Sequence, residues 1–157
     1  MQPDIGISAK NLENSAELLS TILADEMTLY IKTRKFHWNV SGESFMELHK
    51  LYENQYKQLE ESIDQIAERI GKLGQKTIGT MHEFLSLTSI KEHPDQNLSS
   101  KGTLGELLKD HETVIIKLRK GVASSMDEYK DAGTADFLTG LMEQHETMAW
   151  VLRRYLN

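Results

Sequence analysis

The chain has 157 residues, of which 39% are hydrophobic and 27% are charged, and its formal net charge is −6 at pH 7. The negative charge disfavours binding to nucleic acid, and the absence of cysteine excludes disulfides and thiolate metal sites. With no apolar run of eighteen residues and no leader peptide, we expect a cytoplasmic protein without a membrane segment. The length suits a single domain over residues 1–157, which begins with a short tail over residues 1–10.

Two long helices are predicted in the first half of the chain. In the first, apolar residues recur at three- and four-residue spacing, the period of one helix face, until an aromatic cluster at residues 36–38. The second begins with Ser44 and Glu47, which have the spacing of a capping box, a motif in which each side chain bonds to the backbone N–H of the other residue. Gly71 and Gly74 mark the end of this helix.

The second half of the chain is predicted to contain a long crossover and two more helices. The crossover, over residues 75–102, is rich in Ser, Thr, Asn and Gly and could hold one short apolar helix near residues 81–87. Thr103 and Glu106 form a second capping-box pattern at the start of the third long helix, and the fourth follows a break near Gly133. Two long hairpins joined by one long connection predict an all-α, ferritin-like four-helix bundle with a short helix in the crossover.

Ligand-type residues occur on the second predicted helix in two pairs that are too far apart to share an ion. His49 and Glu53 are four residues apart, so both project from one helix face, and the same holds for Asp64 and Glu68. Fifteen residues separate the two pairs, which is roughly 22 Å of helix. If two copies pack antiparallel about a two-fold axis, the first pair of one copy meets the second pair of the other. We therefore predict a metal site between subunits, with His37 as a further nitrogen ligand.

The same residues also have an ordinary structural interpretation. Acids on an amphipathic helix are usually solvated, and His37 could simply pack at a helix end. His111 and His145 lie on the apolar stripes of the last two helices, where satisfied core histidines are the better interpretation. A di-iron site inside one bundle needs Glu-x-x-His motifs, and the sequence contains none. Histidine and carboxylate without sulfur suit iron, zinc or manganese, so ligand type alone leaves the metal open.

Two motifs surround these candidate ligands. They are Lys32-x-Arg34-x-Phe36-His37-Trp38-Asn39-Val40-x-Gly42-x-x-Phe45-x-x-Leu48-His49 and Asp64-x-x-Ala67-Glu68-Arg69-Ile70. Together they closely resemble the Dps family of mini-ferritins, and the resemblance extends through the last helix. It implies four-helix subunits that assemble as a hollow dodecamer. It also implies a ferroxidase centre at each two-fold interface, where ferrous iron is oxidised by hydrogen peroxide or O2 and then stored as ferric mineral, which protects against oxidative stress.

The resemblance also implies a role for each candidate ligand. By position, His37 and His49 are similar to the iron ligands from one subunit, and Asp64 and Glu68 to those from its neighbour. Glu53 stands where many members of the family have aspartate. Its longer side chain keeps a carboxylate for the metal but would alter the second iron position.

Further roles are implied outside the ligand set. Trp38 is similar to the family's tryptophan beside the centre, which is a sink for stray oxidising equivalents, although interface packing is the plainer role. Asp127, Asp131 and Asp136 resemble the acids that line the three-fold pores through which iron enters. Solvated loop acids are the alternative interpretation of these three residues.

The family name refers to DNA, and here the sequence departs from the pattern. Members that bind DNA directly usually carry a tail rich in Lys and Arg, whereas residues 1–13 contain one lysine, Lys10, and two acids. Twelve subunits would carry a formal charge of 12 × −6 = −72, so direct DNA binding is doubtful. A nucleoid-associated protein that coats and protects DNA is the main alternative to an iron-storage ferroxidase. A helical adaptor without metal chemistry is a third hypothesis.

Overall fold

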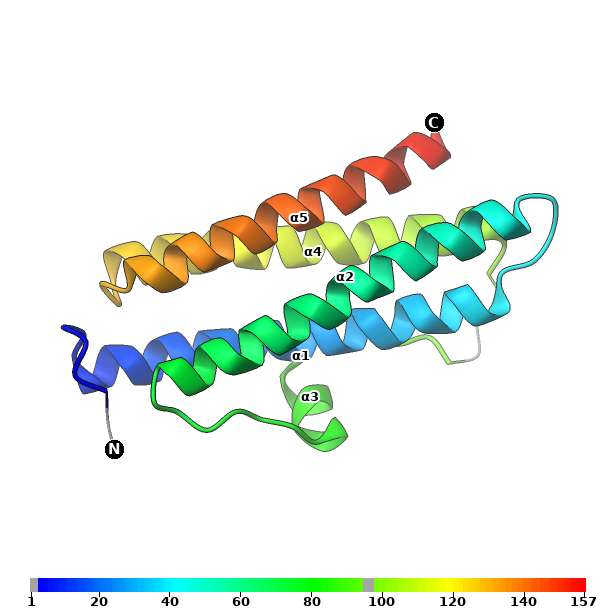
Figure 1. The fold of residues 1–157 in the computed structure, drawn as a ribbon. Helices are drawn as coiled ribbons and strands as arrows, with labels where there is room; N and C mark the ends of the chain where they lie inside the picture. Colours follow the sequence, from blue (N-terminus) through cyan, green and yellow to red (C-terminus); the bar gives the residue numbers. More distant parts are fainter. Residues whose placement is uncertain (1–2, 95–97) are drawn as a thin grey trace.

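The computed structural model describes residues 3–94 and 98–157, and five helices form most of that part of the chain (Figure 1). Four of these helices are long: α1 (Ala9–Asn39), α2 (Phe45–Lys72), α4 (Ser100–Asp127) and α5 (Ala132–Leu156). The short helix α3 (Met81–Leu87) lies in the crossover between α2 and α4. The described residues contain no strand, so the predicted all-α class and the short crossover helix are confirmed. None of the described helices is long and apolar enough to cross a membrane.

The long helices pair as two antiparallel hairpins, α1 with α2 and α4 with α5, which lie side by side (Figure 1). The short helix α3 packs against α1, on the side away from the α4–α5 hairpin. The connection between α1 and α2 lies at the same end of the bundle as the start of α4, whereas the turn between α4 and α5 lies at the opposite end. The candidate histidine ligands near residues 37 and 49 are therefore placed at one end of the molecule.

Apolar side chains at the predicted helical spacing form the core between the hairpins. Every long helix contributes fully buried aliphatic residues, including Leu19, Leu23, Leu59, Ile66, Leu107, Leu118, Leu138 and Leu152. Each such side chain contributes about 1.5–3 kcal/mol when it is removed from water. This burial, rather than intrinsic helix propensity, holds the two hairpins together.

A buried carboxylate attaches the crossover to the bundle. Asp25 of α1 is fully buried, and its Oδ1 accepts hydrogen bonds from the backbone N–H of Ser89 (2.6 Å) and the hydroxyl of Thr88 (2.9 Å). The ammonium group of Lys117 on α4 lies 2.5 Å from Oδ2 of the same carboxylate. Because the buried charge is both paired and hydrogen-bonded, it can hold the chain after α3 against α1 and α4.

The predicted capping box at the start of α2 is wrong. Ser44 precedes the helix, but its side chain accepts no hydrogen bond from the first turn. Its backbone (φ −94°, ψ 20°) lacks the extended conformation that a capping residue normally adopts. Glu47, the other half of the predicted box, instead accepts a hydrogen bond from the Tyr155 hydroxyl at 2.8 Å. The Glu47 side chain that the local motif requires therefore bonds to a residue distant in the sequence.

The capping box predicted at the start of α4 is also wrong. The helix begins earlier, at Ser100, and its N-cap is Ser99, whose hydroxyl accepts a hydrogen bond from the N–H of Gly102 at 3.1 Å. Thr103 lies inside the first turn, where its hydroxyl bonds to the Ser100 carbonyl and meets the Tyr52 hydroxyl at 2.8 Å. A reciprocal capping box does occur at α3, between Thr80 and Glu83, and was missed although the spacing is the same.

Candidate metal centre

The two predicted nitrogen ligands lie against each other where α1 ends and α2 begins. The Nδ1 atom of His37 is 2.8 Å from the carbonyl oxygen of His49, and the Nδ1 atom of His49 is 2.9 Å from the carbonyl oxygen of His37. Because a carbonyl oxygen only accepts hydrogen bonds, both Nδ1 atoms carry a proton, and in the neutral rings both Nε2 atoms keep a lone pair. The rings stack, with 3.7 Å between their centroids. The chain therefore holds two adjacent imidazoles in a tautomer that binds metal ions.

Aromatic residues surround the buried member of this pair. The ring of Tyr56 meets His37 edge to face, with 5.2 Å between the centroids. Trp38, the next residue in α1, is 63% exposed, and the guanidinium group of Arg34 lies 5.2 Å from its ring and 4.5 Å from that of Tyr56. A large apolar side chain is thus left at the surface directly beside a candidate ligand.

The Glu53 carboxylate lies on α2, one turn beyond His49, and is held by two lysines. Its Oε1 atom is 2.5 Å from the ammonium nitrogen of Lys57, and its Oε2 atom is 2.9 Å from that of Lys50. Hydrogen bonds from Lys57 and then Lys50 lower the pKa of the Glu53 carboxyl to about 2. The group is therefore ionised at neutral pH, as a metal ligand must be, but both of its oxygens already have partners.

The other two predicted ligands lie farther along α2. Asp64 and Glu68 are both exposed, and Glu68 pairs with Lys72 at 3.1 Å. Because α2 is one continuous helix, Asp64 still lies roughly 22 Å along it from His49, and Glu68 lies one turn farther. Among the residues that the structure describes, no three His, Asp or Glu side chains come together to hold a metal ion. The structure brings the two histidines together but leaves Asp64 and Glu68 far from them within one chain. The shared site between subunits therefore stays a prediction.

The three predicted pore acids differ in their surroundings. Asp127 and Asp136 are exposed at the end of α4 and the start of α5. Asp131 is buried and is the N-cap of α5, where it accepts hydrogen bonds from the N–H (2.9 Å) and hydroxyl (2.6 Å) of Thr134. Burial alone would raise the pKa of Asp131, but the bonds from Thr134 and the charge of Arg69 lower it. Asp131 is engaged in holding this turn, so Asp127 and Asp136 are the acids free to meet solvent ions.

The other two helix-borne histidines form a closed cluster in the core. His111 and His145 are completely buried, and their Nδ1 atoms are 2.9 Å apart. The Nε2 atom of His145 is 2.6 Å from Oε1 of Glu26, which is also completely buried. Burial, and next the proximity of His145, lowers the pKa of His111 well below its usual value. The prediction of satisfied core histidines is confirmed for His145, whereas Nε2 of His111 and Oε2 of Glu26 have no partner in the described part of the chain.

Sequence reasoning missed Glu26, although a signal was present. Glu26 lies seven residues after Leu19 and fourteen after Leu12, so it falls on the apolar stripe of α1. An acid on such a stripe requires a buried partner. The cluster differs from a metal site because His145 turns opposite nitrogens toward Glu26 and His111, so one ion cannot bind all three as they lie.

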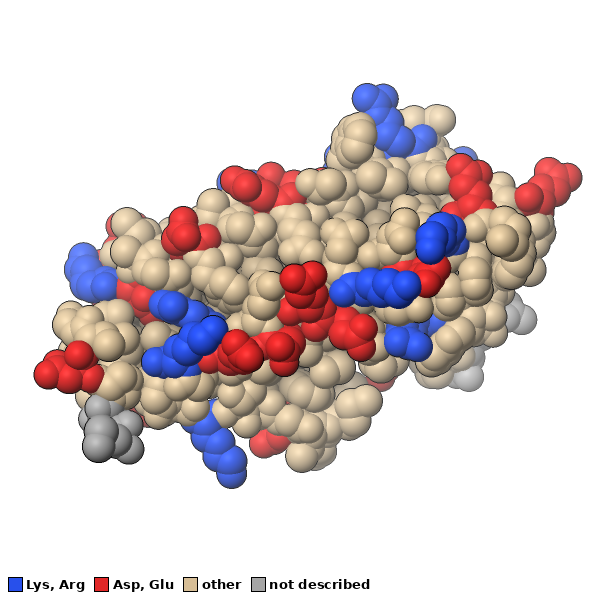
Figure 2. Space-filling model, viewed as in Figure 1, with Lys and Arg blue, Asp and Glu red and all other residues tan. Residues whose placement is uncertain are grey.

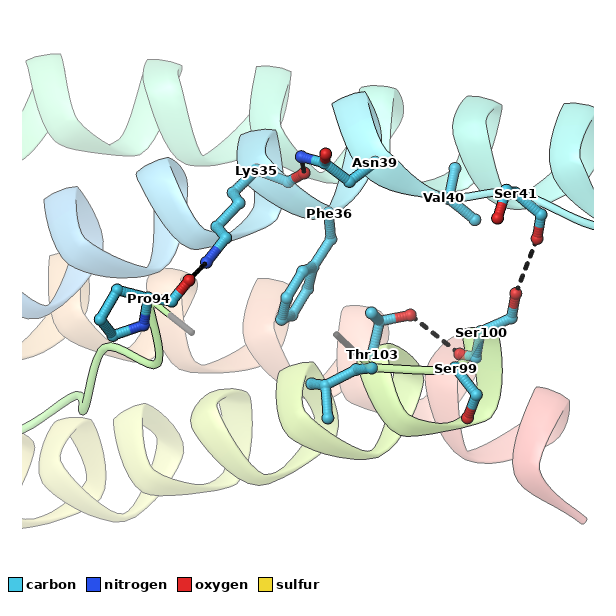
Figure 3. A pocket seen from close by; sticks show the side chains of 10 residues that line it. Lys35, Phe36, Asn39, Val40, Ser41, Pro94, Ser99, Ser100 and Thr103 are labelled. Carbon is cyan, nitrogen blue, oxygen red and sulfur yellow. Dashed lines mark hydrogen bonds between the residues drawn. The ribbon is translucent and has the colours of Figure 1, made fainter. Parts of the chain in front are cut away.

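A pocket of about 530 Å³ opens near the end of α1, between that helix and the start of α4 (Figure 3). Its polar groups are largely bonded to one another. The Lys35 ammonium donates to the Pro94 carbonyl at 3.1 Å, and the Ser100 hydroxyl donates to the Ser41 carbonyl at 3.2 Å. Among the described residues that line this pocket, none is a histidine or an acid.

Comparison with known proteins agrees with the ferritin-like fold. A model of the ferritin-like domain family matches residues 16–157. The chain is 46% identical to a low temperature-induced protein of a Nostoc species, covering 98% of this chain and 86% of that protein. It is 36% identical to DNA protection during starvation protein 2 of Bacillus anthracis, covering 90% of this chain and 95% of that protein.

Solved structures show the same fold over nearly the whole chain. The Dps protein of Vibrio cholerae, described as a member of a broad superfamily of ferritin-like diiron-carboxylate proteins, superposes with a TM-score of 0.93 at 28% identity. That similarity covers 99% of this chain and 97% of the Vibrio chain. DpsC of Streptomyces coelicolor superposes with a TM-score of 0.95 at 28% identity, covering 100% and 91% of the two chains. The fold, the family model and the relatives together show that this chain belongs to the Dps family of ferritin-like proteins.

Proposed function

We propose that this protein is an iron-storage ferroxidase, which oxidises ferrous iron with hydrogen peroxide or O2 at sites between subunits and stores the ferric product inside a dodecameric shell. The observation that carries this proposal is the reciprocal bonding of His37 and His49. Each ring donates its Nδ1 proton to the other residue's carbonyl oxygen, which leaves both Nε2 atoms able to bind a cation.

The remaining ligands would come from a second copy of the chain. An antiparallel two-fold pairing of α2 brings Asp64 and Glu68 of the partner toward the histidine pair, as their spacing along the helix requires. Apolar side chains exposed beside the histidines support such a contact, since Trp38 is 63% and Met46 is 72% exposed in the single chain. Surfaces of this kind are commonly covered by another protein molecule.

The ligand set fits iron oxidation. Neutral imidazoles suit ferrous iron, and the carboxylates stabilise the more highly charged ferric product. Two ferrous ions each give one electron to one hydrogen peroxide molecule, which takes up two protons and becomes two water molecules. This paired reaction avoids the one-electron step that releases hydroxyl radical. Zinc and manganese suit the same ligands, and iron is chosen because the structurally similar Vibrio protein is described as a diiron-carboxylate superfamily member.

The double variant His37→Ala/His49→Ala tests the assignment. We expect the initial rate of peroxide-dependent ferrous oxidation to fall at least about tenfold, since losing even outer groups of a metal site typically has effects of this size. His82→Ala is the control, because His82 is exposed on α3 and belongs to no proposed site. An unchanged rate in a double variant that still assembles would contradict the proposal. A wild-type protein that sediments as a monomer or an isolated dimer would contradict the shell.

DNA coating is the competing function, because several relatives are named for DNA protection. The charge of −6 per chain disfavours it, and the face in Figure 2 shows acidic and basic side chains interspersed without a continuous basic patch. Removal of iron and peroxide would protect DNA without contact. A gel-shift assay at moderate salt separates the two functions, and retarded DNA would favour coating.

A further inference from the structure

Among the five candidate ligands, Glu53 is held between two ammonium groups. We propose that Lys50 and Lys57 compete with a cation for the Glu53 carboxylate, and so weaken iron binding at the position of the centre that uses Glu53. The inference rests on the proposed function, because it concerns how that same site is loaded. It makes the two lysines determinants of metal occupancy.

The spacing along α2 creates this arrangement. Lys50 precedes Glu53 by three residues and Lys57 follows it by four, so all three project from one face of the helix. Each lysine engages a different carboxylate oxygen, at 2.9 Å for Lys50 and 2.5 Å for Lys57. A cation that approaches either oxygen of Glu53 therefore meets an ammonium group already in place.

The acids farther along α2 form fewer ion pairs with lysine than Glu53 does. Glu68 pairs with one lysine, Lys72, through one oxygen at 3.1 Å, and Asp64 forms no ion pair within the described residues. The Glu53 side chain is also less exposed than that of Glu68, at 23% against 60%, so water screens its two pairs less. Figure 2 shows a run of acidic side chains along the middle of the line of α2, with basic side chains toward its two ends. The competition is thus strongest at Glu53 and weaker at the two ligands predicted to come from the partner.

The size of the effect follows from the strength of such pairs. One exposed pair at this spacing on a helix changes an equilibrium constant about twofold. Two pairs, together with the repulsion between a doubly charged ion and two ammonium groups, should weaken binding about three- to tenfold. The binding step that does not use Glu53 should be affected much less.

Weaker binding at the position that uses Glu53 has a chemical consequence. With one position filled, a centre can supply only one electron to hydrogen peroxide, whereas two filled positions supply the pair that reduces it to water. Lys50 and Lys57 therefore set the ferrous concentration at which the paired reaction begins. This chain should need more iron for that reaction than a variant without the two lysines.

Anaerobic calorimetric titration of the assembled protein with ferrous iron tests the inference. The wild type should show two binding steps at each centre. In Lys50→Gln/Lys57→Gln, the weaker step should tighten about three- to tenfold, while the stronger step and the total stoichiometry stay nearly unchanged. Both lysines are exposed in the single chain, so the variant should fold normally.

Two control variants separate local competition from net charge. Lys10→Gln removes the Lys10–Glu13 pair, an exposed pair on α1 with a separation of 2.9 Å and the same three-residue spacing, and should leave both steps unchanged. Lys57→Arg retains the charge and should keep the wild-type affinities. An unchanged weaker step in the double variant, or an equal shift in Lys10→Gln, overturns the inference. A wild type that binds no ferrous iron overturns the proposed function, and this inference with it.

Discussion

The His37–His49 pair and the His111–His145 pair contain the same side chains in opposite surroundings. Where α1 ends and α2 begins, both rings bond through Nδ1 to backbone carbonyls, and their Nε2 atoms have no hydrogen bond to any residue that the structure describes. In the core, the two rings bond to each other through Nδ1, and His145 also bonds to Glu26. The difference teaches that burial and packing partners, rather than position in a helical pattern, separate a candidate ligand pair at the edge of the bundle from a histidine cluster closed inside the core.

The two pairs should also differ in what they contribute to stability. The core pair is completely buried together with a carboxylate, so each member depends on the others for hydrogen bonds and charge balance. The pair at the hairpin end lies at the edge of the bundle, and its bonds are to backbone atoms of the same hairpin. We therefore expect substitutions in the core pair to affect folding and those in the outer pair to affect iron chemistry.

The largest loss of folding stability is expected for His145→Leu. This change removes the only hydrogen-bond partner that the structure shows for the buried Glu26 carboxylate, which should cost about 3–5 kcal/mol in the free energy of unfolding. Chemical denaturation measures it. The triple variant Glu26→Leu/His111→Leu/His145→Leu should recover most of the loss, because an apolar cluster needs no partners. Equal stability of His145→Leu and the wild type would contradict the difference between the two pairs.

An intermediate change in folding stability is expected when the pH is lowered. The pKa of His111 is lowered in the folded state, whereas the unfolded chain takes up this proton near the ordinary value of 6.5. The unfolded state therefore binds more protons below pH 6.5, and stability falls with decreasing pH by up to about 1.4 kcal/mol per unit for this group. Denaturation series from pH 7.5 to 5 on the wild type and the triple variant should diverge as the pH falls. Parallel curves would show that the core pair does not titrate in this way.

The smallest change in folding stability is expected for His49→Gln. This variant loses one hydrogen bond to the carbonyl of His37 in a partly exposed place, so the free energy of unfolding should change by only about 1 kcal/mol or less. Denaturation under the same conditions as for His145→Leu gives the comparison directly. A loss as large as that of His145→Leu would mean that the outer pair is also a folding element.

Periodic patterns in the sequence were sufficient to predict the helices and to place two candidate histidines where the first helix ends and the second begins. The crossover helix α3 occurs at the predicted residues, and His37 and His49 come together because an antiparallel hairpin brings the end of one helix to the start of the next. The local capping motifs failed at two of three helix starts. At α2, the Glu47 side chain that the motif needs bonds instead to Tyr155, which is distant in sequence.

The sequence by itself determined the four long helices, their apolar faces and the two separated groups of ligand-type residues, because these depend on spacing along one helix. Only the tertiary structure decided which polar atoms meet. In the folded chain, the Nδ1 atoms of His37 and His49 bond to backbone carbonyls. Glu26 bonds to His145 across the bundle, and Asp131 accepts a hydrogen bond from the Thr134 hydroxyl at the start of α5. Hydrogen bonds between residues far apart in the chain depend on how the helices pack, and no periodic pattern within one helix contains that information.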